Sequence, residues 1–234
     1  MLRSIRKFGM GMLVYPFLVS LGHASVDVKS LHLEKCDEFV EIKRNGENKY
    51  LSNINIKAAL FHCEEALKHF PKNGKILLQL GRIYIFQGRK EDGLNLLKSA
   101  SSDGYSESSY YLGIYYFNSG GGPSEKEKAF QYFKLAAQSG HPEAQRSVGL
   151  AYLNGDGTRK SVREGVAWIR RAAKQNEPEA LFGLGLMYLR GNNVLRRNLE
   201  VAAKYFAMAH EHGHPHGRKM QNAAELTIRL ERNN

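Results

Sequence analysis

The sequence predicts an all-α fold built from stacked helix pairs, and three observations lead to this prediction. Only 6 of the 234 residues are proline, while 23 are glycine and 10% are aromatic. One glycine recurs at a nearly constant spacing, with apolar residues at helical intervals around it. A turn follows each apolar run. Self-similarity at a period of roughly 20 to 50 residues is typical of solenoids, in which every unit packs against the next.

The recurrent small residues give the period of the array. The glycine marks the first helix of each pair, at intervals of 32, 36 and 36 residues: Gly81, Gly113, Gly149 and Gly185. A second set marks the second helices, at intervals of 34, 36, 36 and 36 residues: Ala59, Gly93, Ala129, Gly165 and Val201. Small residues let two helices approach closely. Because a single pair cannot bury its apolar face alone, the pairs are expected to stack.

The N-terminal residues 1–24 differ in composition from the rest. A basic opening precedes an uncharged, mostly apolar run over 8–21, and Gly22 and Ala24 are small residues before a cleavage point after Ala24. This is the pattern of a secretory signal peptide. The apolar run is shorter than the roughly 20 residues that span a bilayer. We expect a cleaved signal and a periplasmic or secreted chain without an integral membrane span; an uncleaved anchor and a buried first helix are the alternatives.

The chain is basic throughout its length. Its formal charge is +11, and removal of residues 1–24, which carry three positive charges and no acid, leaves +8. Basic surfaces attract nucleic acid, anionic lipid or acidic polymers. The charges are not gathered into a run of five or more, which favours a solvated surface over a nucleic-acid tract. We therefore expect no nucleic acid as partner, and keep an anionic envelope polymer as an alternative to a protein or peptide.

Residues 25–73 are predicted to form a helical hairpin, with helices over 26–42 and 55–70. Cys36 and Cys63 lie on the two helices, and the midpoint between them falls in the connection. An antiparallel hairpin would therefore bring the two sulfurs face to face. Paired cysteines in an exported chain indicate a disulfide. Two buried thiols that never meet are the alternative.

The regular part of the array follows this hairpin. Ser124 with Glu127, and Ser161 with Glu164, form predicted capping boxes at the start of two second helices. A helix over about 218–231 has no partner after it and is expected to cap the array. The predicted units are 74–105, 106–141, 142–177, 178–213 and the C-terminal capping segment 214–234.

At these residues the chain resembles a known family. Residues 59–100 look like tetratricopeptide repeats, and about 106–214 resemble Sel-one-like repeats, their 36-residue relatives. Residues 142–177 carry the second pattern best, through Ala144, Gly149, Tyr152, Gly155, Trp168, Ala172 and Ala173. The resemblance implies a right-handed α-solenoid and a binding scaffold. Exported bacterial members of similar layout act in envelope assembly, in the flagellar motor or in host interaction.

The sequence predicts no enzyme, no catalytic residue and no cofactor. It lacks a nucleophile elbow, a phosphate-binding loop and a dinucleotide fingerprint. Secreted, cysteine-rich relatives are described as binding or cleaving β-lactam-like ligands, but they carry a cysteine pair in every repeat. Here the units over 74–213 contain no cysteine. Hydrolysis of β-lactams or wall fragments is therefore the least favoured alternative.

Four histidines lie between His210 and His216 and could hold a transition metal. Their spacing is not the i, i+4 pair of a metalloprotease helix. Gly140-His141-Pro142 is the same turn between repeats, earlier in the array. An ordinary turn between repeats, with no metal, is therefore the favoured interpretation.

Binding is expected in a groove on the concave face of the solenoid. In the tetratricopeptide frame, the second, fifth, ninth and twelfth positions of each first helix are exposed there. Tyr, Phe and Arg are common anchors of protein interfaces. At these positions the predicted binding residues are Arg82, Tyr110, Phe117, Arg146 and Phe182. The alternative is that several of them pack against a neighbouring unit.

Overall fold

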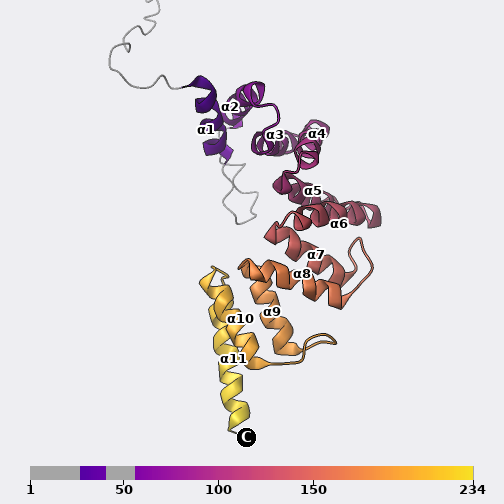
Figure 1. Ribbon diagram of the computed structural model, residues 1–234, viewed down its shortest axis with the longest axis vertical. Helices are drawn as coiled ribbons and strands as arrows, with labels where there is room; N and C mark the ends of the chain where they lie inside the picture. Colours follow the sequence, from indigo (N-terminus) through magenta and orange to yellow (C-terminus); the bar gives the residue numbers. More distant parts are fainter. Residues whose placement is uncertain (1–26, 41–55, 234) are drawn as a thin grey trace, which may run out of the picture.

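The computed structural model describes residues 27–40 and 56–233, in which every regular element is an α-helix. Successive helix pairs follow a curved path from α1 to α11 (Figure 1). The helices are α1 (Val28–Val40), α2 (Ile56–His69), α3 (Gly74–Phe86), α4 (Lys90–Ser102), α5 (Ser106–Asn118), α6 (Pro123–Gln138), α7 (Pro142–Asn154), α8 (Val162–Lys174), α9 (Pro178–Arg190), α10 (Leu199–Glu211) and α11 (Gly217–Arg232). The predicted α-solenoid is confirmed. The expected signal peptide lies outside the described residues.

Within each pair, the two helices touch at the recurrent small residues. A Cβ atom on Gly149 of α7 would lie 2.5 Å from Ile169 Cγ1 and 3.0 Å from the carbonyl oxygen of Gly165 on α8. A Cβ atom on Gly93 would lie 2.4 Å from the carbonyl oxygen of Gly81. Real side chains do not tolerate such distances, so these positions require glycine for the helices to be this close.

The core runs along the array between successive pairs. Its largest fully buried side chains include Ile76, Leu80, Leu112, Val148, Ile169, Leu184 and Phe206. The last helix, α11, packs Ala224 against the cluster around Phe206. Two ion pairs hold its C-terminal end, Arg197–Glu231 at 2.7 Å and Arg232–Glu200 at 3.0 Å. Helix α11 therefore covers the end of the core, as a capping helix must.

One of the two predicted capping boxes is wrong. Ser161 caps α8 as expected, and its hydroxyl accepts a hydrogen bond from the Glu164 amide at 3.3 Å. Helix α6 begins at Pro123 instead, with Gly122 as the capping residue at φ 80° and no side-chain cap. Proline fits the first position of a helix because its missing N–H would have no partner there. Ser124 is therefore already inside the first turn.

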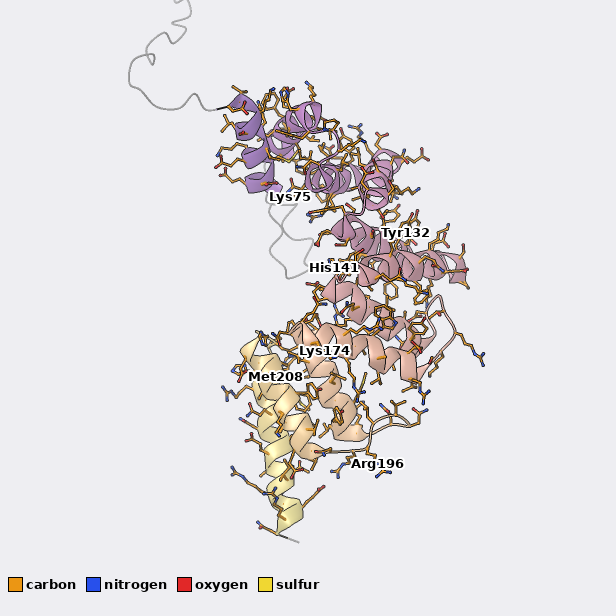
Figure 2. All side chains as sticks on the ribbon, in the orientation of Figure 1. Lys75, Tyr132, His141, Lys174, Arg196 and Met208 are labelled. Carbon is orange, nitrogen blue, oxygen red and sulfur yellow. A yellow bond between two sulfur atoms is a disulfide. The ribbon has the colours of Figure 1, made fainter. Side chains whose placement is uncertain are left out.

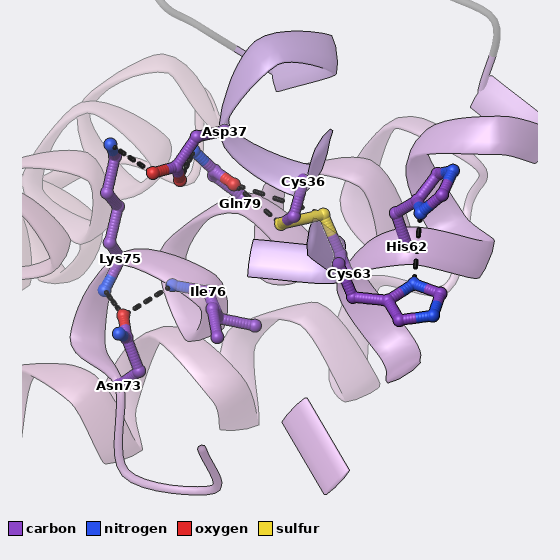
Figure 3. Close-up of a disulfide and its surroundings, with 9 residues drawn as sticks. Cys36, Asp37, His62, Cys63, Asn73, Lys75, Ile76 and Gln79 are labelled. Carbon is purple, nitrogen blue, oxygen red and sulfur yellow. Dashed lines mark hydrogen bonds and ion pairs between the residues drawn. A yellow bond between two sulfur atoms is a disulfide. The ribbon is translucent and has the colours of Figure 1, made fainter. Parts of the chain in front are cut away.

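The predicted disulfide between Cys36 and Cys63 joins α1 to α2, with 4.7 Å between the Cα atoms. Figure 3 shows α3 packed against it through Gln79, whose Oε1 lies 2.9 Å from Cys36 Sγ. Gln79 Nε2 donates to Asp37 Oδ1 at 3.3 Å, and Asp37 also pairs with Lys75 at 2.7 Å. The disulfide thus fixes the hairpin, and these polar contacts attach the hairpin to the first regular pair.

Two glycines of α9 provide a matched test of helix contact. A Cβ atom at Gly185 would lie 2.6 Å from the Phe206 ring, whereas one at Gly183 would meet nothing within 4 Å. Gly185→Ala should lower the free energy of unfolding by about 1 to 3 kcal/mol through overpacking. Gly183→Ala should raise it by about 0.5 to 1 kcal/mol, because alanine favours the helix. Urea denaturation of both variants measures this, and shifts of the same sign would contradict the contact.

Breaking the disulfide should loosen α1 and α2 selectively. Closing a loop between cysteines 27 residues apart stabilises by about 3 to 4 kcal/mol. Reduction should therefore increase amide hydrogen exchange in α1 and α2 by about a hundredfold or more. Exchange in α7 to α10 should not change, because repeat units contact only their neighbours. The Cys36→Ala, Cys63→Ala variant should show the same exchange with and without reductant.

Candidate functional site

The structure brings two of the five predicted binding residues, Phe117 and Arg146, to one hollow between α5, α6 and α7. The hollow has a volume of about 260 Å³. Its floor comes from α6, through Ala129, Phe130 and Phe133. Apolar walls come from the first helices on either side, through Ile114, Phe117, Leu150 and Ala151. Phe117 is 51% exposed and Leu150 is 40% exposed, so the hollow opens to solvent between two large apolar side chains.

The polar end of this hollow is closed by an ion pair. Lys126 Nζ on α6 lies 2.8 Å from Asp156 Oδ1, in the turn after α7. This hydrogen bond is the main cause that lowers the pKa of Asp156. A Cβ atom on Gly157 would lie 2.1 Å from the Lys126 carbonyl oxygen, so the turn lies directly against α6. The amides of Asn118 and Asn154 line the same end.

Arg146 is held by the following unit. Its Nε donates to Glu177 Oε1 at 3.1 Å, and the Glu177 side chain is only 3% exposed. Burial raises the pKa of Glu177 to about 7, while the charge of Arg146 acts in the opposite direction. Glu177 also accepts a hydrogen bond from the Ala180 amide and so caps α9. Arg146 therefore joins the wall of the hollow to the start of the next pair.

In α5, α7 and α9, the residue at the fifth position contacts a residue in the turn that follows its own helix pair. Tyr110 packs on His141, with ring centroids 4.5 Å apart, and Phe182 stacks on His214 at 3.9 Å. Arg146 and Glu177 occupy the equivalent positions. Burial raises the pKa of Tyr110 to about 12. Tyr110 and Phe182 thus pack mainly against residues of the turns between repeats, and neither lines the hollow.

Arg82 lies apart from the hollow as well. Its guanidinium sits over the Tyr111 ring, 4.6 Å from the centroid. Burial is the main cause that lowers its pKa. Nη1 is buried and has no hydrogen-bond partner among the residues that the structure describes. This arginine therefore packs between α3 and α5.

His214, in the histidine-rich segment, occupies the position that His141 holds two units earlier. The amide of His141 donates to Ala136 and that of His214 to Ala209, in equivalent turns. His141 also accepts from the Ala144 amide through Nδ1, so Nε2 carries the proton that it donates to Glu107 at 2.9 Å. No group of three or more His, Cys, Asp or Glu residues in the described ranges could hold a metal.

Sequence reasoning missed the floor and the polar end of the hollow. Phe130 and Phe133 follow the helical period and read as ordinary core residues. Lys126 and Asp156 lie in different units. The one available signal was Gly157, the second loop glycine of the repeat, which brings the turn against α6. The ionisable groups lining the hollow are Lys126, Arg146 and Asp156, and all three are in ion pairs. Such a site suits binding of an apolar side chain.

Two family profiles match the sequence. The profile of the tetratricopeptide repeat matches residues 50–113, and the profile of the Sel1 repeat matches residues 106–141, 142–177 and 178–214. No curated protein matches the chain. Among the helices of the described ranges, none combines the length and apolar character that crossing a membrane requires.

The chain is similar to solved structures of repeat proteins. A Sel1 repeat protein from Oxalobacter formigenes aligns with a TM-score of 0.61 at 22% identity, covering 73% of this chain and 75% of its own. A protective antigen of uropathogenic Escherichia coli with an SLR fold, c5321, aligns with a TM-score of 0.46 at 19% identity, covering 85% of this chain and 49% of its own. The first of these similarities supports the fold alone.

The buried carboxyl of Glu177 predicts a pH dependence of stability. Its pKa is about 7 in the folded chain, against a usual value of 4.5. The folded state therefore binds this proton more tightly, and the stability it provides is complete below pH 4.5 and lost as pH rises through about 7. Glu177→Gln cannot ionise. The free energy of unfolding of the wild type, relative to this variant, should fall by up to about 3 kcal/mol between pH 4.5 and 8. A constant difference across this range would contradict the assignment.

Proposed function

Because this chain belongs to the family of tetratricopeptide and Sel1 repeat proteins, we propose that it is a non-catalytic scaffold that binds another protein at the hollow between α5, α6 and α7. The observation that carries this proposal is the exposure of Phe117 and Leu150 over an apolar floor. Repeat scaffolds of this kind bind partners along the surface of the array. In this proposal Phe117 is the anchor of the interface, and Arg146 positions its edge.

The size and lining of the hollow favour a peptide or protein side chain over a small molecule. Its volume is about 260 Å³, below the roughly 300 to 1,000 Å³ of typical ligand pockets. One aromatic or large aliphatic side chain would fill it. The amides of Asn118 and Asn154 at the polar end can bond to the main chain on either side of that side chain. The partner would therefore present an apolar residue on an exposed segment.

We further propose that the scaffold works outside the cytoplasm, in the cell envelope or beyond it. The Cys36–Cys63 disulfide supports this, because disulfides persist mainly in oxidising compartments. The signal-like composition of residues 1–24 supports it independently. Envelope assembly, a motor structure and host interaction are the processes that the family resemblance suggests.

Site-specific photo-crosslinking tests the proposed surface. A photoreactive phenylalanine analogue replaces Phe117 in one protein and Phe61 in a control, because Phe61 is a similarly exposed phenylalanine on α2. An envelope extract of the source cells should give a discrete crosslinked protein with the first and not with the second. Adding Leu150→Asp to the first protein should remove the product by placing a charge in the apolar wall.

The identity and salt dependence of the product decide between the alternatives. A product that forms equally at Phe61 and Phe117 would contradict the proposed site. Crosslinks to glycan alone, weakening with salt, would instead favour the anionic-polymer alternative. Thermal unfolding of the Leu150→Asp variant serves as the folding control, since Leu150 is 40% exposed and lies outside the core, so that the midpoint should change little.

A further inference from the structure

A second groove lies between α8 and α10. It has a volume of about 420 Å³, and its lining includes Ala173, Leu181, Val201, Tyr205 and Met208. Three basic side chains, Arg170, Lys174 and Lys204, complete the lining. Figure 2 shows Lys174 on α8 beside Met208 on α10, which is 37% exposed. The groove thus pairs an apolar floor with a cationic rim.

The groove is open because one residue departs from the repeat. Trp168 follows Gly165 by three residues and is buried in the cluster that joins α6, α7 and α8. Lys204 follows Val201 by the same three residues, so it occupies the equivalent position on α10. A lysine at this position extends to solvent. It therefore leaves unfilled the space that a tryptophan would occupy.

The cations of this face have no acidic partners. Arg163, Arg170 and Lys174 lie at i, i+7 and i+11, on one side of α8. Arg163 and Lys160 also line a polar hollow at the start of α8. None of these residues, nor Lys204, forms an ion pair with a carboxylate of the described residues. Arg170 instead donates to the Tyr188 hydroxyl at 3.1 Å.

We propose that the groove between α8 and α10 binds an acidic amphipathic helix of another protein. Apolar residues on one side of that helix would cover Val201, Tyr205 and Met208. Its carboxylates would pair with the cations of the rim, which supplies the charge complementarity that sets partner and orientation. A helix lying between α8 and α10 would pack on them as the helices of the array pack on one another.

Other occupants fit less well. A nucleic acid or an acidic glycan would satisfy the cations but leave the apolar floor uncovered. A flat membrane cannot enter a groove whose floor includes the buried side chains of Ala173 and Leu181. A second copy of this chain carries the same strongly positive net charge and would repel the rim.

A designed peptide tests the proposal on the complete mature chain. The probe is a fluorescent helical peptide with leucine at i, i+3, i+4 and i+7 and glutamate at the other exposed positions. We expect saturable binding by fluorescence anisotropy in physiological salt. Lys204→Glu should weaken it by about tenfold or more. Lys98→Glu changes the net charge equally on the exposed face of α4 and should have an effect several times smaller.

A filling variant tests whether the peptide needs the open space of the groove. Lys204→Trp restores the residue that the repeat carries at Trp168. It should abolish peptide binding without lowering the midpoint of thermal unfolding, because the new ring fills an existing space. Phe117→Ala should leave peptide binding unchanged, so failure here and failure of the hollow between α5, α6 and α7 are distinguishable.

Three outcomes would overturn the proposal. The first is equal affinity for a scrambled peptide of the same composition, which would show a surface that binds any polyanion. The second is binding to vesicles of anionic phospholipid that matches the peptide and is insensitive to Lys204→Trp. The third is no saturable binding of the peptide at all, with the chain folded.

Discussion

The close contact of two helices at a pair of small residues is the constraint on which the whole structure depends. Gly149 and Gly165 bring α7 and α8 so near that either glycine's Cβ atom would meet the other's carbonyl oxygen at about 3 Å. At this separation the side chains of Ile169 and Leu153 nest against the two glycines. Other large apolar residues of the pair, such as Val148 and Trp168, pack toward the pair before. Stacking is then required to bury them, and a lone helix such as α11 is required to end the stack.

Contacts between successive pairs are more varied in chemistry than contacts within them. One position is filled by an aromatic ring on a histidine at Tyr110, by a guanidinium on a carboxylate at Arg146, and by a stacked ring at Phe182. The geometry is the same in all three. The motif therefore defines where a residue lies but does not determine how much of its side chain is exposed to solvent. A prediction made only from position in the repeat therefore assigned both buried and exposed residues to one groove.

The period, the helix pairs and the disulfide could be predicted from sequence because each depends on local features: small residues at fixed spacing, turn residues and two cysteines about one hairpin connection. The start of α6 could not be predicted in this way. Pro123 and Ser124 are both typical of a helix N-terminus, and the proline determines the boundary. The floor of the hollow could not either. Phe130 and Phe133 follow the helical period, and their place at the floor of a hollow depends on how neighbouring units pack.

Both grooves arise where the array departs from its own pattern. Ile85 nests against Gly93, and Leu153 against Gly165, within about 3 Å of where a Cβ atom would stand. The equivalent pair in α5 and α6 is Phe117 and Ala129. A real Cβ atom at Ala129 occupies the space in which Ile85 and Leu153 nest, so the larger phenylalanine is left half exposed. The groove between α8 and α10 is open for a similar reason, because Lys204 stands where the preceding unit has Trp168. Residues that keep the pattern pack between helices, whereas Phe117 and Lys204 depart from it and line the two proposed binding sites.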